Sequence, residues 1–458
     1  MQALQWIFST PGASRCLMEG NIPYARASMD RFLHLPEGHA GLSYSSAEAT
    51  SIMASSARSR AAQALLEDTS DLSMLRSCHV FGVACSAALV SAQPKKGAHR
   101  CHVAVASEGE TCVYSLTLEK GLRTREAEDA LCSRLIIDAI GHATTEGRSP
   151  DGSAGETSSG DFPFAKEVMS ASEHIECSIR HLLASHINDV LERICCRQSR
   201  HALFVAAKQS PSSSSALPPP ATQQLAYLED VQLPRNALVF PGSFNPLHSG
   251  HVELVVAALK LRGPAPEGVP HFPVVFEIAA VNVDKPPVPK EELLSRIESL
   301  LSSPLLKMAG VTNVGVSITS EPLFVHKSRL FRGCTFVIGA DTMSRLINSK
   351  YYRAPAGASP SLSEEQHSAL ASHAMVAALA TIAERGCRFI VGGRVPPSSG
   401  PAEGKSSVPQ FETLENITRS SAATLPPEIL SMFSGIDETQ FRADISSSEI
   451  RSRKEGKV

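Results

Sequence analysis

The sequence predicts an α/β protein in which a separate α/β domain precedes a C-terminal doubly wound parallel sheet. Three observations support this fold class. From residue 234 onward, apolar segments of strand length alternate with segments of helical periodicity, as in parallel sheets with helical crossovers. Residues 242–251, rich in glycine and histidine, join the first of these strands to the first helix. Serine and proline runs at residues 210–220 predict a flexible linker before the sheet.

The same signals divide the chain into three parts. We expect one domain at residues 1–145 and a second at residues 234–458. Residues 146–161 are rich in glycine, serine and acidic residues, which predicts a loop. Apolar residues recur three and four apart within residues 164–196, which predicts a helix. Residues 146–233 are therefore interpreted as a helical connector followed by the linker.

Each domain has a predicted order of elements. In the first domain we expect helices at 46–66 and 123–140 and strands at 79–84, 102–107 and 111–118, the last two able to pair as a hairpin. In the second we expect strands at 236–240, 274–281, 314–319, 335–338 and 387–391, and helices at 252–261 and 289–301. Residues 322–327 are expected to precede a further helix-like segment that runs to residue 331. Residues 354–363 and 396–409 look like surface insertions, and Glu291, Glu292 and Arg296 are expected to be exposed. Ligands of such a sheet bind at the carboxyl ends of its strands.

Composition excludes several classes of protein. The 458 residues suggest two to four domains with room for more than one core. A net charge of −3, from 43 basic and 46 acidic residues, argues against a general binder of nucleic acid or membrane surfaces. No apolar run reaches the roughly 18 residues that span a bilayer, and no secretory signal is visible. Eleven cysteines without a C-x-x-C pair favour free thiols in a reducing compartment, so we expect a cytoplasmic or nuclear protein, with a homo-oligomer as an option.

Residues 239–251 read Val-Phe-Pro-Gly-Ser-Phe-Asn-Pro-Leu-His-Ser-Gly-His and lie on the turn from strand to helix. At such a turn the first helical amides converge and the helix dipole favours an anion. Gly242 lets the backbone approach a ligand closely because it has no Cβ, and Gly250 leaves space beside the histidines. His248 and His251 are three residues apart, so they point to one side of the helix start. Two imidazoles there can donate hydrogen bonds to phosphate oxygens that gain charge in a transition state.

This stretch resembles the G-x-F-x-P-x-H-x-G-H signature of the nucleotidylyltransferase superfamily, whose domain is Rossmann-like. The resemblance implies that the phosphates of ATP lie over the turn, and that Mg²⁺ arrives with the nucleotide and neutralises its charge. It also implies an in-line attack on the α-phosphorus with pyrophosphate as leaving group. On this interpretation His248 and His251 are catalytic, and the ATP site includes Gly242, Ser243, Phe244 and Gly250.

A second stretch, residues 444–451, reads Asp-Ile-Ser-Ser-Ser-Glu-Ile-Arg and resembles the I-S-S-T-x-I-R element of adenylyltransferases. The resemblance implies that Ser446 and Ser447 hold phosphate oxygens of ATP. Arg451 then supplies a planar catalytic cation. The alternative is an ordinary helix start capped by one of the two serines.

Four further residues are candidates for binding the mononucleotide that accepts the adenylyl group. Asp341 stands in a Gly-Ala-Asp sequence that resembles the Gly-x-Asp of pyridine nucleotide adenylyltransferases, although a turn or helix cap would explain it too. Tyr352, next to Tyr351, lies where such enzymes often place a tryptophan that stacks on the pyridine ring; core packing is the alternative. Arg394 could reach a phosphate or form a surface salt bridge. Lys285 matches a lysine of the family but could be a solvated loop residue.

Together these motifs most resemble a nicotinamide or nicotinate mononucleotide adenylyltransferase. The expected substrates are therefore ATP and a small pyridine mononucleotide. A phosphopantetheine adenylyltransferase shares the histidines and serines and stays open as an alternative. A CTP-dependent enzyme is disfavoured because its Arg-Thr-x-Gly-Ile-Ser-Thr-Thr element is absent. The competing class is a non-catalytic nucleotide-binding regulator.

The first domain resembles the CinA-type C-terminal domain, through Pro-Gly-Ala-Ser at 11–14, Glu-Gly-x-x-Pro-Tyr at 19–24, Gly-Val-Ala at 82–84 and Gly-Leu-Arg-Thr-Arg-Glu-Ala at 121–127. In that family the domain can convert nicotinamide mononucleotide to nicotinate mononucleotide. This chain begins after the strand and Ser-x-Thr-Gly-Gly turn that carry the family's catalytic serine, and it lacks the glycine-rich run of the second loop. We therefore expect a remnant without amidohydrolase activity, in which Tyr24 and Arg125 best match the family's pocket.

Overall fold

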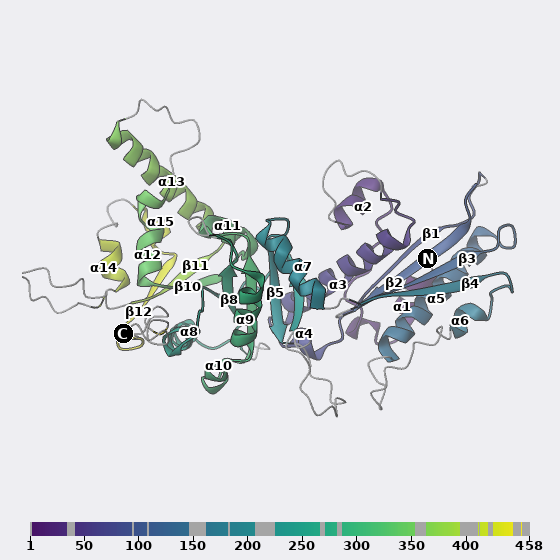
Figure 1. Ribbon diagram of the computed structural model, residues 1–458, viewed down its shortest axis with the longest axis horizontal. Helices are drawn as coiled ribbons and strands as arrows, with labels where there is room; N and C mark the ends of the chain where they lie inside the picture. Colours follow the sequence, from purple (N-terminus) through teal and green to yellow (C-terminus); the bar gives the residue numbers. More distant parts are fainter. Residues whose placement is uncertain are drawn as a thin grey trace, which may run out of the picture. The chain divides into compact units, whose positions relative to one another are not determined.

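The computed structural model describes residues 2–33, 42–93, 96–107, 110–145, 162–181, 184–206, 225–265, 271–281, 286–352, 363–393, 411, 413–419, 425–442 and 450. The chain divides into two compact units. The first comprises Met1–Leu65, Leu75–Ile187 and Ala207–Ala226, and the second comprises Leu66–Met74, Asn188–Ala206 and Tyr227–Val458. Figure 1 shows the elements of each unit along the chain.

A four-stranded antiparallel sheet forms the centre of the first unit. Its strands, in spatial order, are β1 (Gly82–Ala88), β2 (His99–Ala106), β3 (Glu110–Leu118) and β4 (His174–His181). The predicted pairing of the second and third strands is confirmed, with Val103 opposite Tyr114. Side chains alternate between the two faces along each strand, so this one sheet can support two separate cores.

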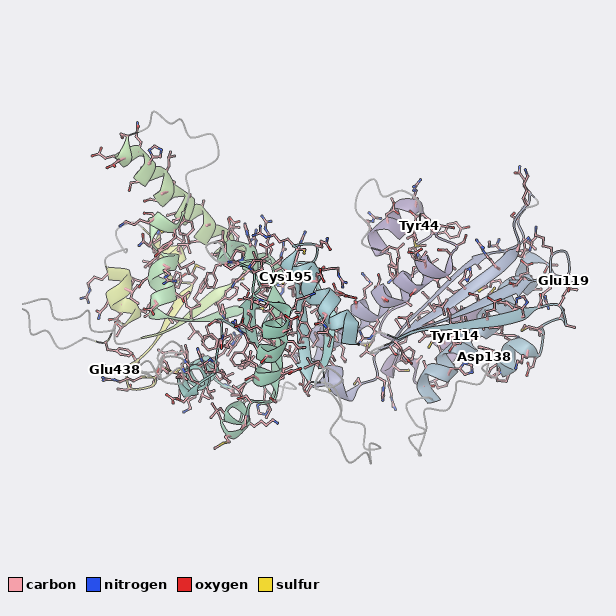
Figure 2. All side chains as sticks on the ribbon, in the orientation of Figure 1. Tyr44, Tyr114, Glu119, Asp138, Cys195 and Glu438 are labelled. Atoms are coloured by element: carbon pink, nitrogen blue, oxygen red, sulfur yellow. The ribbon has the colours of Figure 1, made fainter. Side chains whose placement is uncertain are left out.

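Helices cover both faces of this sheet. They are α1 (Gln2–Ser9), α2 (Arg26–Phe32), α3 (Ala47–Thr69), α5 (Arg125–Thr145) and α6 (Pro163–Lys166), with the short η1 (Ala13–Arg15) after α1. Val103 and Leu116 pack with Leu131 of α5 in one core, whereas Ala104 and Met53 belong to the other. Asp138 of α5, labelled in Figure 2, fixes α6 by accepting hydrogen bonds from the Phe164 and Ala165 amides at 3.2 and 2.9 Å.

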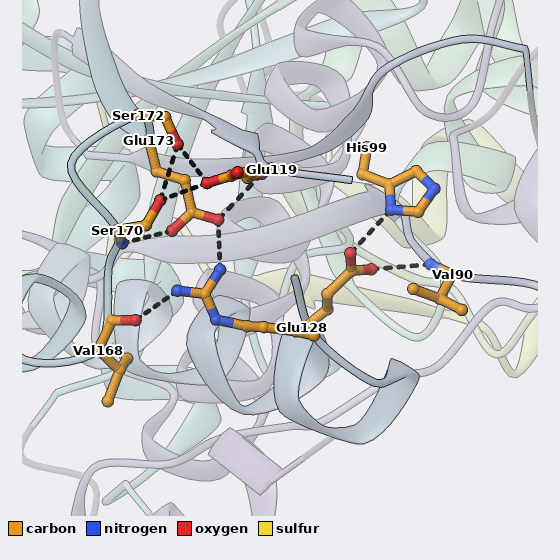
Figure 3. Close-up of polar contacts among 9 residues, drawn as sticks. Val90, His99, Glu119, Glu128, Val168, Ser170, Ser172 and Glu173 are labelled. Atoms are coloured by element: carbon orange, nitrogen blue, oxygen red, sulfur yellow. Dashed lines mark hydrogen bonds and ion pairs between the residues drawn. The ribbon is translucent and has the colours of Figure 1, made fainter. Parts of the chain in front are cut away.

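Buried carboxylates hold the loops around the start of α5. Glu128 is fully buried and accepts hydrogen bonds at 2.8 Å from the Val90 amide and from Nδ1 of His99. Glu173 accepts from the Glu119 and Ser170 amides at 3.0 and 2.9 Å and pairs with the Arg123 guanidinium. These contacts, drawn in Figure 3, join segments far apart in the sequence. Their role is to satisfy backbone donors that would otherwise be buried unpaired.

The second unit is built on an eight-stranded sheet with the order β12-β11-β10-β7-β8-β9-β5-β6. Its strands are β5 (His201–Ala206), β6 (Leu225–Glu229), β7 (Leu238–Pro241), β8 (Val274–Ala279), β9 (Val314–Thr319), β10 (Thr335–Gly339), β11 (Arg388–Gly392) and β12 (Phe433–Ile436). The six strands from β12 to β9 run parallel, and β5 pairs antiparallel with β9. The predicted α/β class with a doubly wound parallel sheet is confirmed.

Helices lie on both faces of the large sheet (Figure 1). They are α7 (Ala184–Cys195), α8 (Ser249–Arg262), α9 (Lys290–Leu301), α10 (Pro304–Met308), α11 (Phe324–Leu330), α12 (Ala340–Leu346), α13 (Glu364–Glu384), α14 (Leu414–Arg419) and α15 (Pro427–Leu430); the short α4 (Met74–Ser77) starts where the chain returns to the first unit. Phe240 of β7 faces His251 of α8, with 5.8 Å between ring centroids. The neighbouring Val239 pairs in register with Phe336, whose ring contacts Phe324 of α11 on the opposite face.

The segment between the predicted domains differs from the connector expected at residues 146–233. The prediction of one helix over 164–196 is wrong, because its middle is strand β4, which completes the first sheet. Ile175 and Ile179 are four apart, which fits a helix, but Cys177 between them makes the alternation of a strand. Strands β5 and β6 extend the second sheet, so the second unit includes residues before 234. None of the helices in the described ranges is long and apolar enough to cross a membrane.

Candidate active site

The large sheet changes its winding direction at β7. From β7 the chain passes through α8 to β8 on one side, and later enters β10 on the other side of β7. Connections that leave in opposite directions open a crevice at the carboxyl ends of the two strands, where ligands of such sheets bind. Residues 242–251 follow the carboxyl end of β7, and Asp341 follows β10 by two residues. Two of the predicted motifs therefore come together at neighbouring strand ends.

His248 and His251 form a stacked pair at the start of α8. His248 is the N-cap residue, with an extended backbone, and the ring centroids are 3.7 Å apart with 29° between the planes. The prediction that both rings point to one side of the helix start is confirmed. The His248 amide donates to Nδ1 of His251 at 3.3 Å. Nδ1 of His251 is therefore the acceptor, so the neutral ring carries its proton on Nε2.

Burial keeps both rings neutral. Burial, with a smaller contribution from the neighbouring His248, lowers the pKa of His251 to about 3. Burial also lowers the pKa of His248, against the opposing effect of Glu253. Nδ1 of His248 is buried without a hydrogen-bond partner among the described residues. The pair thus presents hydrogen-bond donors without adding positive charge.

The loop between β7 and α8 is shaped by the Phe244 side chain. Phe244 is buried, with ring centroids 5.2 Å from Phe240 and His251 and 5.1 Å from Phe276. A Cβ on Gly242 would lie 2.6 Å from the Phe244 ring, so only glycine fits while that ring stays in place. Phe244 itself has a φ of 45°, in the left-handed region that side chains disfavour. Packing of the aromatic ring therefore fixes a backbone conformation that the sequence alone would not favour.

Helix α9 holds the other side of this loop. The Asn245 side-chain amide donates to Oε1 of Glu292 at 2.9 Å, and Nη1 of Arg296 donates to the Ser243 carbonyl at 3.1 Å. Glu292 and Arg296 also pair with each other across one helical turn. The expectation that Arg296 is exposed is wrong, since 13% of its side chain is accessible. The spacing of four between an acid and a base was the available signal, but it is equally typical of a solvated helix face.

Comparison with known proteins agrees with this geometry. Residues 239–453 match the model of the cytidylyltransferase-like family. They form a nucleotidylyltransferase-superfamily domain. No curated protein and no solved structure matches the chain. The resemblance inferred from the histidine motif is thus confirmed at the level of the superfamily, and the domain's general chemistry is nucleotidylyl transfer.

The other predicted site residues of the nucleotidylyltransferase domain differ in their exposure and contacts. Ser243 and Asp341 are exposed, and Gly250 is buried in the first turn of α8. The hydroxyl of Tyr352 donates to the Leu346 carbonyl at 2.7 Å, and burial raises its pKa to about 12. One edge of the Tyr352 ring is therefore anchored to the end of α12. Five predicted residues lie outside the described part of the chain: Lys285, Arg394, Ser446, Ser447 and Arg451.

Sequence reasoning missed a buried charged cluster of the same domain. Glu277 of β8 is fully buried and accepts hydrogen bonds at 2.6 Å from Nζ of Lys327 and from the Thr319 hydroxyl. Glu277 pairs in register with Pro241, and its backbone carbonyl accepts from the Gly242 amide at 2.9 Å. The charges thus lie beside the strand end that carries the histidine loop. A single acid within an apolar strand was the only signal in the sequence.

Among the described residues, no hydrogen bond or ring contact joins Tyr24 to Arg125, the two candidate residues of the first unit. The side chain of Tyr24 is 91% exposed. Nη1 of Arg125 donates to the Val90 carbonyl at 2.7 Å. Arg125 therefore helps Glu128 to fix the loop after β1, because the two side chains bind the two polar groups of the same residue, Val90.

Proposed function

We propose that the nucleotidylyltransferase domain transfers the adenylyl group of ATP to the phosphate of nicotinamide or nicotinate mononucleotide, releasing pyrophosphate. The observation that carries the proposal is the stacked pair of neutral histidines at the helix start, beside the carboxyl ends of the neighbouring strands β7 and β10. Neutral imidazoles at a helix N-terminus suit a phosphate that gains charge in the transition state, and the tautomer of His251 leaves its Nε2–H free to donate.

In the proposed reaction Nε2–H of His251 donates to an oxygen of the α-phosphate, and His248 donates to the bridge toward the leaving pyrophosphate. The acceptor phosphate attacks the α-phosphorus in line, so no side chain forms a covalent bond. The protein contributes position and hydrogen bonds, which are worth most in a site from which water is excluded. The aromatic rings of Phe240, Phe244 and Phe276 pack together beside His251 and would help to exclude water from it.

The charge of the triphosphate needs other partners, because both histidines are neutral. Arg451 is proposed to supply one positive charge, with Ser446 and Ser447 as donors to the same phosphates. Mg²⁺ bound to ATP would supply the rest and would lower the charge repulsion that opposes the attack. Gly242, Ser243, Phe244 and Gly250 are proposed to line the ATP site.

The acceptor is proposed on the basis of the residues that follow the other strands. Asp341 lies in α12, directly after β10, and β10 is the neighbour of β7, the strand that leads into the histidine loop. Tyr352 follows α12. Lys285 and Arg394 are the proposed phosphate ligands of the mononucleotide. Phosphopantetheine is the competing acceptor because the histidine and serine motifs would serve it equally.

The test is pyrophosphate release by the full chain with Mg²⁺, using ATP or CTP as donor and nicotinamide mononucleotide, nicotinate mononucleotide or phosphopantetheine as acceptor. We expect turnover with ATP and a pyridine mononucleotide, and formation of the corresponding dinucleotide. Turnover with phosphopantetheine alone would replace the proposed acceptor, and turnover with CTP alone would replace the donor. ATP binding without turnover on any acceptor would favour a regulatory nucleotide-binding protein.

For the first unit we propose a CinA-type domain without amidohydrolase activity. Support comes from Arg125, whose guanidinium bonds a loop carbonyl. The assay is ammonia release from nicotinamide mononucleotide by the full chain, since residues 1–145 alone would lack strand β4. Steady ammonia release above the background rate would refute the proposal.

A further inference from the structure

The peptide between Ser243 and Phe244 is oriented from outside the loop. Its carbonyl oxygen accepts a hydrogen bond from Nη1 of Arg296 at 3.1 Å. The carbonyl and N–H of a trans peptide point in opposite directions, so the Phe244 N–H points away from α9. Among the described residues this N–H has no acceptor. It is a backbone donor that a ligand could use.

The side chain that orients this peptide is itself held in place. Glu292 pairs with Arg296, and the same Glu292 oxygen accepts from the Asn245 side chain at 2.9 Å. One turn of α9 is therefore hydrogen-bonded to the loop on both sides of Phe244, at Ser243 and at Asn245. Phe244 is the residue with a φ of 45°. Nε of Arg296 is buried without a partner among the described residues. Leaving a charged donor without a partner costs folding free energy. We therefore infer that the position of the guanidinium is set by its hydrogen bond to the loop and not by its own stability.

The geometry points to Arg296 and Glu292 as positioning residues for nucleotidylyl transfer. By holding the Ser243 carbonyl on the α9 side, Arg296 turns the Phe244 N–H toward the space in which a phosphate of the nucleotide would lie. A residue of left-handed conformation among turning amides is the usual frame of an anion-binding concavity. Glu292 fixes the guanidinium and the Asn245 amide. This inference rests on the proposed function, in which a nucleotide phosphate lies over the loop.

The experiment compares three α9 variants with a matched control. Arg296→Met removes the donor and keeps the length of the side chain, Arg296→Lys keeps the charge but loses the planar fork, and Glu292→Gln removes the pairing charge. Glu291→Gln is the control, since Glu291 is the exposed neighbour of Glu292 on the same helix. Two measurements are made: amide exchange at Gly242 and His248 in the free protein, and the ATP dependence of pyrophosphate release.

In Arg296→Met we expect exchange at these two amides to rise by at least about tenfold, as for the loss of one charge-assisted hydrogen bond. We expect kcat to fall by about 10- to 100-fold because the loop donors are misplaced, while KM for ATP changes by less than about threefold. Arg296→Lys and Glu292→Gln should lie between Arg296→Met and the wild type. Glu291→Gln should match the wild type.

Unchanged exchange at Gly242 and His248 in Arg296→Met would overturn the positioning role. A rise in KM for ATP at constant kcat would also overturn it, because it would make Arg296 a direct ligand of the phosphates. If the wild type releases no pyrophosphate with any acceptor, the proposed function fails. The exchange measurement would then still decide whether α9 orders the loop.

Discussion

Nζ of Lys327 donates a hydrogen bond to Oε2 of Glu277 at 2.6 Å, and both side chains are buried within the nucleotidylyltransferase domain. Glu277 lies on β8 and Lys327 on α11, so the pair joins a central strand to a helix on the face opposite the histidines. Each ion compensates the charge of the other, which matters because both are buried away from the protein surface. The pair is therefore a point at which the removal of one partner should be much more harmful than the removal of both.

The first prediction concerns this ion pair. Lys327→Met leaves Glu277 buried and unpaired, which should destabilise the domain by about 3–5 kcal/mol. At about 2–4 °C per kcal/mol, its melting temperature should fall by at least about 6 °C. The double variant with Glu277→Gln should recover part of the loss, as a thermal unfolding series would show. A double variant that is less stable than Lys327→Met would contradict this account.

A second prediction concerns the close contact between Gly242 and Phe244. Gly242→Ala places a Cβ where the Phe244 ring lies, 2.6 Å from its nearest atom, so the ring must move out of the aromatic cluster. Overpacking of this kind costs about 1–3 kcal/mol and should disturb the loop that carries His248. We expect lower stability and at least tenfold slower turnover, by analogy with the cost of about 1 Å of misplacement. Gly141→Ala, at a helical glycine with open space around it, is the control and should retain turnover.

The parallel sheet and the strand-to-helix turn of the histidine motif could be predicted from the sequence, because hydrophobic periodicity and the residues of a turn are local features of the chain. It was insufficient for β4, whose isoleucines fit two periods, and for β5 and β6, which only pairing with the large sheet defines. Strand β5 contains a continuous apolar run, Ala-Leu-Phe-Val-Ala, but lay in a segment interpreted as a connector.

The site shows the same division between local and tertiary information. The histidine pair could be located from the spacing of His248 and His251. Its neutral state could not, because burial and the 3.7 Å stacking cause it. The hydrogen bond from Arg296 to the Ser243 carbonyl forms only because α9 packs beside residues more than forty positions earlier in the chain. Spacing within α9 gives no information about such a contact.

A third prediction tests the role of His251. We expect His251→Ala to lower turnover about 100-fold or more while ATP binding persists, since the imidazole bonds more strongly to the transition state than to ATP. His373→Ala, at an exposed histidine of α13, is the matched control and should leave turnover unchanged. Steady-state kinetics and calorimetric ATP titration separate the two effects. Full turnover in purified His251→Ala would refute the assignment.

The lowered pKa of His251 also predicts a pH dependence of stability. Its pKa is about 3 in the folded protein against 6.5 for a free side chain, so between these values only the unfolded state binds the proton. The stabilising contribution is therefore complete above pH 6.5 and is lost as the pH falls toward 3. Between pH 6.5 and 5 this amounts to about 2 kcal/mol. Thermal unfolding at both pH values should show a smaller acid shift for His251→Gln than for the wild type, and equal shifts would contradict the burial argument.

The last prediction separates the two substrates. The hydroxyl of Tyr352 is bonded to the Leu346 carbonyl, so Tyr352→Phe should cost about 1 kcal/mol of stability but leave a stacking ring in place. Tyr352→Ala should weaken the mononucleotide by roughly 0.5–1.5 kcal/mol if stacking is the only loss. Arg451→Ala should instead raise KM for ATP and lower turnover, through a lost contact of roughly 1.5–3 kcal/mol. Steady-state kinetics with each substrate varied in turn, and Tyr351→Ala as the exposed neighbouring control, decide between these roles. If Tyr352→Ala leaves KM for the mononucleotide unchanged, the ring only packs against α12 and the pyridine is bound elsewhere.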